Sequence, residues 1–259
     1  MMNRLLRILL LIPALYLVLM PVYYSQWHYS KPCRGIKITI DDSSRYHFVT
    51  KKDIQNTIII NNGSILGKPV KEIRVAEIEN TMGRYRELKT AEVYMSIDGI
   101  LHIYADQRTP IMRVMANNGG DYFVDTEGVV VRRRNLYTPR LHIVGGNINI
   151  SQAMLEGVSV LDTSIRNSIL KDIYHLVNYI NNNSFWSAQI DQIFVDGHDE
   201  IDLIPRVGSH TVHLGSAENF EGKLNNLEVF YEKVLPEMGW NKYSIINLAF
   251  RDQIVCKRR

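Results

Sequence analysis

The stretch GSAENFEGKL, at residues 215–224, carries two glycines and a lysine, the residue types that hold nucleotide phosphates in a glycine-rich loop. Such a loop needs four residues between its glycines and a Ser or Thr after the lysine, because the amides wrap one phosphate and the hydroxyl meets magnesium. Here six residues separate the glycines, Leu224 follows Lys223, and Glu218 and Glu221 place negative charge where a polyphosphate would lie. We therefore expect no nucleotide cofactor. We expect Gly215 to end a strand and residues 216–219 to begin a helix, with Gly222 as an exposed helix position.

A second group of polar residues has the types that bind metal ions: His198, Asp199, Glu200 and Asp202. They straddle a predicted turn and alternate along the next strand, whereas a catalytic zinc site needs at least three converging ligands. His210 and His213 are three residues apart in a predicted strand, so they point to opposite faces and cannot chelate together. We expect a polar turn and surface or edge histidines here, and no metal.

Motifs of nucleophilic or metal-assisted hydrolysis are missing from the chain. It has no G-x-S-x-G elbow, no H-E-x-x-H pair and no cysteine placed beside a base by a recognisable motif. Carboxylates from distant positions can still converge in a fold. A membrane-anchored envelope hydrolase therefore stays as an alternative, but the sequence favours a protein that is not an enzyme.

The start of the chain predicts a membrane anchor. Residues 5–24, LLRILLLIPALYLVLMPVYY, are apolar apart from Arg7, and at 1.5 Å per residue a helix of this length nearly matches the ~30 Å hydrocarbon core. A cleaved secretory signal is the rival interpretation, but the bulky residues that follow offer no small-residue cleavage site. Arg4 lies just before the span and Arg7 in its first turn, so the positive charge is at the N-terminal end, which favours a cytoplasmic N-terminal tail at 1–4 and an outer location for everything after residue 24.

Net charge and cysteine content argue against a nucleic-acid binder and a disulfide scaffold. The formal net charge is +3, and Arg4 and Arg7 at the N-terminal end of the span account for much of it, so the outer part lacks the basic excess of a nucleic-acid binder. Two cysteines, Cys33 and Cys256, are too few for a disulfide scaffold, and whether they pair stays open.

After a linker at 25–34, the first outer domain is predicted at 35–107. Alternation predicts a strand at 36–41, Thr50 and Asp53 begin a helix, and a less regular apolar pattern indicates a second helix from 73 to 88. Strands at 92–97 and 100–105 then flank Asp98-Gly99, a tight-hairpin signal. The order strand, helix, helix, strand, strand is that of a small α+β domain.

A larger domain is predicted at 108–259. A hairpin at 122–131 precedes the clearest helix, at 163–180, whose isoleucines and leucines recur on one face. A hairpin at 189–205, a strand at 209–215 and a helix at 220–235 follow, with Phe220, Leu224 and Leu227 on the apolar face of that helix. Strands at 243–250 and 253–257 finish an α+β fold that is rich in strands.

Three local segments accompany this order of elements: QRTPIMRV followed by DYFVDTEG, the LHIVGG segment, and the closing YSIINLAFRDQIVCKRR. With these segments in this order the chain resembles the bacterial division protein family FtsQ, also called DivIB. The resemblance implies a POTRA domain at 35–107, a distal β domain with two packed helices, no catalysis and no cofactor. It implies a single-pass protein of the cytoplasmic membrane, enriched at the septum, with its C-terminal part in the periplasm.

The resemblance also implies a partner and a site. Proteins of this family link early and late division proteins and bind the FtsB/FtsL coiled-coil pair; other septal proteins can bind the POTRA domain. Carried onto this sequence, the partner-binding residues are Phe250, Asp252, Gln253, Ile254, Val255, Cys256 and Lys257, with Phe220, Leu224 and Leu227 of the preceding helix. The chain departs from the family pattern at Asn247, Ala249 and Gln253, where an acid, an arginine and a glycine are common.

The residues suggest the same mechanism without the resemblance. A terminal strand at a sheet edge leaves N–H and C=O groups unpaired, so an extended partner segment can add to it. A third interpretation, a POTRA protein that feeds an outer-membrane barrel, needs many alternating spans after the POTRA domain, and two predicted helices interrupt that region.

Overall fold

A computed structural model describes residues 15–17, 19–20, 31–41, 49–133, 139–166, 168–251 and 253–259. By its internal contacts the chain divides into two compact units, Met1–Gln107 and Arg108–Arg259. Most of the predicted membrane span at 5–24 lies outside the described residues. Among those that are described, no helix has the length and apolar character needed to cross a bilayer. The anchor stays a prediction.

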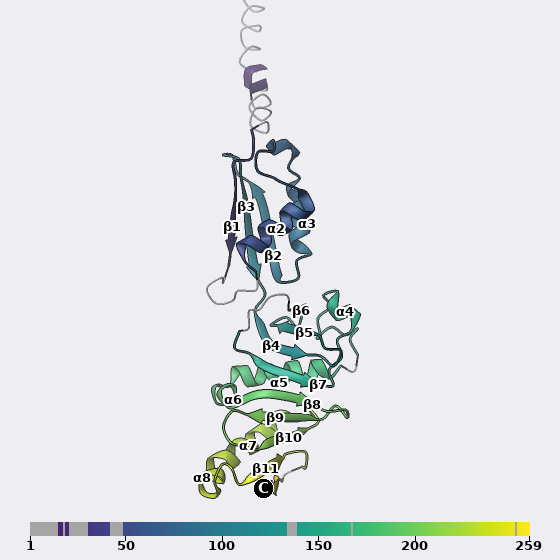
Figure 1. The fold of residues 1–259 in the computed structure, drawn as a ribbon, viewed down its shortest axis with the longest axis vertical. Coiled ribbons are helices and arrows are strands. Elements are labelled where there is room, and N and C mark those ends of the chain that lie inside the picture. Colours follow the sequence, from purple (N-terminus) through teal and green to yellow (C-terminus); the bar gives the residue numbers. More distant parts are fainter. Residues whose placement is uncertain are drawn as a thin grey trace, which may run out of the picture. The chain divides into compact units, whose positions relative to one another are not determined.

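The first unit has the expected order of elements (Figure 1): β1 (Gly35–Ile40), α2 (Lys51–Asn62), α3 (Val75–Gly83), β2 (Leu88–Met95) and β3 (Ile100–Gln107). Its sheet runs in the order β1-β3-β2, with β1 parallel to β3 and β2 antiparallel to it. Gly99 has φ 82° in the β2–β3 turn, as the Asp-Gly signal predicts. The expected α+β unit is confirmed.

The helices of this unit bury one face of the sheet. Thr50 and Asp53 form a capping box, in which the Asp53 N–H donates to Thr50 Oγ1 at 3.2 Å and the Thr50 N–H to Asp53 Oδ2 at 2.9 Å. Ile54 and Ile58 of α2 and Met82 of α3 are fully buried against the sheet residues. The start of α2 was thus readable from two polar residues.

The second predicted helix of this unit is shorter than the sequence indicated. Instead of one helix over 73–88, the chain forms a 3₁₀ turn at Val70–Glu72, then α3, and Leu88 opens β2. The five-residue step from Ile73 to Ile78 marks the break, because positions on one helix face recur every three or four residues.

The second unit is built on one mixed sheet of nine strands in the order β12-β11-β10-β9-β8-β7-β4-β5-β6. The strands are β4 (Pro110–Met115), β5 (Asp121–Asp125), β6 (Val130–Arg132), β7 (His142–Gly146), β8 (Ile190–Val195), β9 (Ile201–Pro205), β10 (Thr211–Gly215), β11 (Tyr243–Asn247) and β12 (Val255–Arg258). Three pairs are parallel, namely β4–β7, β7–β8 and β10–β11. The other pairs are antiparallel.

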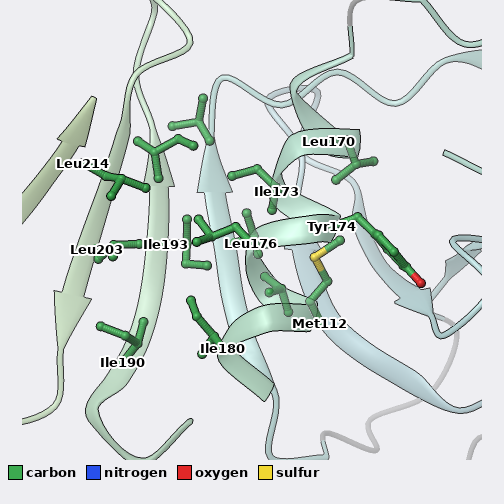
Figure 2. Close-up of a cluster of buried hydrophobic side chains, with 14 of the residues drawn as sticks. Met112, Leu170, Ile173, Tyr174, Leu176, Ile180, Ile190, Ile193, Leu203 and Leu214 are labelled. Carbon is green, nitrogen blue, oxygen red and sulfur yellow. The ribbon is translucent and has the colours of Figure 1, made fainter. Parts of the chain in front are cut away.

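The helices of this unit are α4 (Gln152–Leu155), α5 (Ile169–Asn182), α6 (Ser184–Gln189), α7 (Phe220–Lys233) and α8 (Leu235–Met238). Figure 2 shows Ile173 and Leu176 of α5 pointing toward the strands that carry Ile193 and Leu203, and all four side chains are within 1% of complete burial. The opposite face of the sheet is open at Phe194, which alternates with these buried positions and is 46% exposed. At β8 and β9 the sheet therefore has one core face and one open face.

Two helices of this unit differ from their predicted bounds. The helix predicted at 163–180 begins at Ile169, because Asp162 Oδ1 accepts hydrogen bonds from the Ser164 N–H and hydroxyl and holds the preceding residues in turns. The helix predicted at 220–235 divides into α7 and α8 at Val234, where Pro236 stands at the start of α8 and cannot donate to a continuing helix.

Candidate partner-binding site

β12 is the last strand of the nine-stranded sheet and pairs on one side, with β11. Among the residues that the structure describes, no strand pairs with its other side. Figure 1 places the C terminus beside β11, at this end of the sheet. The expected free edge therefore exists in the described part of the chain, over Val255–Arg258.

The hydrogen bonds around β11 show which backbone groups point outward. The Arg259 N–H donates to the Lys242 carbonyl across the pair at 3.2 Å. Backbone groups alternate sides along a strand, so the amides of Lys257 and Val255 also point to β11, and those of Cys256 and Arg258 point away. The hydrogen bonds between β11 and β10 agree with this assignment. The Leu248 N–H donates to the His213 carbonyl of β10 at 2.8 Å, so by alternation the Ile246 N–H also points to β10. Ile246 therefore does not bond to its partner Cys256, whose N–H points away from the sheet.

Side chains on β12 alternate between the two faces of the sheet. Cys256 lies opposite the fully buried Ile246 and packs against the core, as does Ile254 just before the strand. Burial raises the pKa of the Cys256 thiol. Val255 and Lys257 lie on the open face, and Val255 is 45% exposed. The strand thus offers a partner an apolar position and a cation on the open face.

The turn between β11 and β12 borders a hollow of about 510 Å³. Phe250, Gln253 and Ile254 line it, so the structure brings these three predicted site residues together. Asn219 and Lys223, at the start of α7, line the same hollow and were not predicted for the site. Asp252 lies outside the described residues.

The helix residues of the predicted site lie elsewhere. Leu224 and Leu227 are 0% exposed and belong to the core of the unit. Phe220 is half-buried, and its ring contacts Tyr179 edge-on at 5.6 Å. A partner that binds the folded unit finds no surface at Leu224 or Leu227, so these leucines position α7 beneath the sheet.

Lys223, which raised the possibility of a phosphate loop, has a structural role. Its ammonium donates to the Leu214 carbonyl at 3.0 Å and to the Ser216 carbonyl at 2.8 Å, where β10 ends. Burial lowers the pKa of Lys223. Gly222 is not the open helix position we expected, because the Asn219 side chain lies over it and an added Cβ would meet Asn219 Nδ2 at 2.8 Å.

Two acids that follow the predicted polar turn, Glu200 and Asp202, meet His213 of β10. His213 Nδ1 lies 2.7 Å from Asp202 Oδ1, and its Nε2 lies 3.5 Å from Glu200 Oε2. Sequence reasoning missed this contact because β10 and β9 pair only in the folded sheet. Within the described ranges, no three His, Cys, Asp or Glu side chains form a group that could hold a metal ion.

His210 corrects the expectation of a surface or edge histidine. It is 3% exposed, and its Nε2 lies 2.7 Å from the Tyr231 hydroxyl of α7. Burial lowers the pKa of His210 and raises that of Tyr231. Rings of Trp186 and Trp240 surround Tyr231 at 6.0 and 5.3 Å. No sequence signal separates this histidine from an exposed one, because burial here comes from α6, α7 and the loop before β11.

Comparison with known protein families shows which family the chain belongs to. Residues 109–257 match a family model described as FtsQ/DivIB, C-terminal related. This chain belongs to the FtsQ/DivIB family. Residues 31–105 match a second model, described as a POTRA-like domain. No curated protein matches the chain. The family predicted from the sequence is confirmed.

Membership of the FtsQ/DivIB family gives the general role of the chain. FtsQ/DivIB proteins are non-catalytic proteins of the bacterial division site, and they act as membrane scaffolds that bind other division proteins. The POTRA-like match coincides with the unit of β1 to β3, and the C-terminal match with the nine-stranded sheet. The free edge of β12 therefore lies in the domain that carries the family signature.

Proposed function

We propose that this FtsQ/DivIB protein binds the FtsB/FtsL-type coiled-coil pair by strand addition at the free edge of β12, and so links early to late division proteins. The observation that carries the proposal is the outward direction of the Cys256 and Arg258 backbone N–H groups. An extended segment placed alongside can form main-chain hydrogen bonds with them and continue the sheet.

We place this edge outside the cytoplasm. One span at 5–24 and a cytoplasmic tail at 1–4 make a single-pass protein of the cytoplasmic membrane, with a linker at 25–34, a POTRA domain at 35–107 and the β domain at 108–259 in the periplasm at the septum. The arginines at the N-terminal end of the span, Arg4 and Arg7, support this orientation.

A pair of substitutions at one position tests the main-chain contact. Cys256→Pro removes the outward N–H, whereas Cys256→Ala removes the thiol and keeps that N–H. We expect the proline variant of the full-length protein to lose capture of the purified coiled-coil pair and the alanine variant to keep it. Val255 is unsuitable, because its N–H points to β11 and proline there would disrupt the sheet itself.

The opposite edge supplies a second control. β6 is the other terminal strand, and the Arg133 N–H donates to Asp121 of β5 at 2.9 Å, so the Arg132 N–H points away from the sheet by the same alternation. Arg132→Pro should leave capture unchanged. If Cys256→Pro melts like the wild type and still captures the pair with unchanged affinity, strand addition at β12 is wrong.

A further inference from the structure

Three consecutive cations occupy the last part of the free edge. Lys257, Arg258 and Arg259 are all exposed. Arg259 donates from its guanidinium to the Ser209 carbonyl at 2.8 Å, which ties it to the loop before β10. In the part of the chain that the structure describes, no carboxylate pairs with Lys257 or Arg258. These two charges are available to a partner.

The two cations point to different faces of the sheet. Lys257 lies opposite Ile245 and shares the open face with it. Arg258 lies opposite Tyr243, whose ring packs against Phe230 of α7 at 6.1 Å, so Arg258 borders the helix-covered face. A neighbouring strand also alternates its side chains, so two of its residues at consecutive positions reach these two cations.

The other end of the edge is apolar. Val255 is 45% exposed on the open face, and Ile254 is half-buried on the helix-covered face. Along the edge the surface therefore changes from apolar to cationic within five residues. A second copy of this chain is a poor match, because its own β12 carries the same cations and no acid, so two such edges repel each other.

We propose that the segment that adds to β12 is acidic, with two consecutive Asp or Glu residues beside Lys257 and Arg258 and apolar residues beside Ile254 and Val255. This inference rests on the proposed strand addition and states the chemistry of the partner. The cations then have two effects: they disfavour pairing of two copies of β12, and they favour a strand of opposite charge.

A charge reversal tests the inference. The full-length Lys257→Glu/Arg258→Glu variant should bind the purified coiled-coil pair about tenfold more weakly at ~0.1 M salt, the order expected for two exposed ion pairs replaced by repulsions. The difference should shrink at ~0.5 M salt, because ions screen exposed charges. The control is Arg132→Glu/Arg140→Glu, which makes the same change in net charge at two exposed positions of the same unit, one in β6 and one just before β7, five or more strands from β12 in the sheet.

The outcomes separate this inference from the proposed function. Loss in both the charge-reversed and the Cys256→Pro variants supports both proposals. If Cys256→Pro abolishes capture while the charge-reversed variant binds normally, strand addition stands and the acidic partner is wrong. If the charge-reversed variant does not fold, Lys257→Gln/Arg258→Gln replaces it, because neutral side chains leave β12 intact. This variant should also bind the coiled-coil pair more weakly than the wild type, and unchanged binding overturns the inference. A photo-crosslink from position 255 identifies the bound segment, and a segment without adjacent acidic residues overturns the inference.

Discussion

Leu227→Ala tests whether Leu227, one of the helix residues predicted for the partner-binding site, acts through core packing. Leu227 is 0% exposed in the core of the second unit. The change removes three carbon groups at ~0.8 kcal/mol each, or ~2.4 kcal/mol of transfer free energy, and the cavity left behind raises the expected loss to about 3–4 kcal/mol. For a unit of about 150 residues, that loss corresponds to a fall in Tm of roughly 6–15 °C.

The measurement is thermal and urea unfolding of the full-length protein, followed through tryptophan fluorescence, to which the buried Trp186 contributes. Val229→Ala on the same helix is the matched control, because Val229 is 50% exposed and its truncation should change the unfolding free energy by no more than about 0.5 kcal/mol. Below its Tm the Leu227→Ala variant should capture the coiled-coil pair normally. A loss below ~1 kcal/mol, or weaker capture by the folded variant, would refute the assignment of Leu227 to the core.

Two further predictions concern pH and backbone strain. Burial lowers the folded-state pKa of His210 below its unfolded value of ~6.5, so the unfolded chain binds the proton more readily and stability should fall as pH drops below about 6.5. Denaturant unfolding measured at pH 7.5 and at pH 5 should show a smaller loss of stability in His210→Gln than in the wild type. An equal loss in both proteins would contradict this prediction. Gly146→Ala should destabilise the second unit by about 1–3 kcal/mol or more, because Gly146 has φ +102° and an added Cβ would lie 2.0 Å from the Val195 carbonyl oxygen. Gly145→Ala, whose added Cβ meets nothing within 4 Å, should melt close to the wild type, and equal melting of the two variants would argue against strain at Gly146.

Local signals predicted the elements that local chemistry determines. The Thr50–Asp53 capping box, the Asp98-Gly99 turn and the apolar face of α5 each depend on residues within a few positions of one another. The predicted ends of the helices were less accurate. Asp162 holds the residues before α5 in turns, and Pro236 lacks the N–H that would continue α7. The short helices α4 and α6 were not predicted, since four and six residues are too few to show a period.

The pairing of strands far apart in the chain could not be predicted from the sequence. The parallel pair β4–β7 joins Arg113 to Ile143, and β10–β11 joins Val212 to Ile246, across long connections that no motif predicts. For the candidate site, the edge strand was predictable from its alternation and its place after the last helix. The burial of Leu224 and the hollow beside Phe250 were not, because both depend on how α7 packs under the sheet.

The position of β12 in the chain has a consequence for biosynthesis. β12 bonds to β11, and β11 lies parallel to β10, so β12 becomes the edge of the nine-stranded sheet only when these strands have been synthesised and paired. A nascent chain interrupted anywhere upstream of this hairpin lacks the edge altogether. Recruitment through β12 would therefore select molecules whose synthesis and folding had passed this point, and truncated products would not compete for the partner.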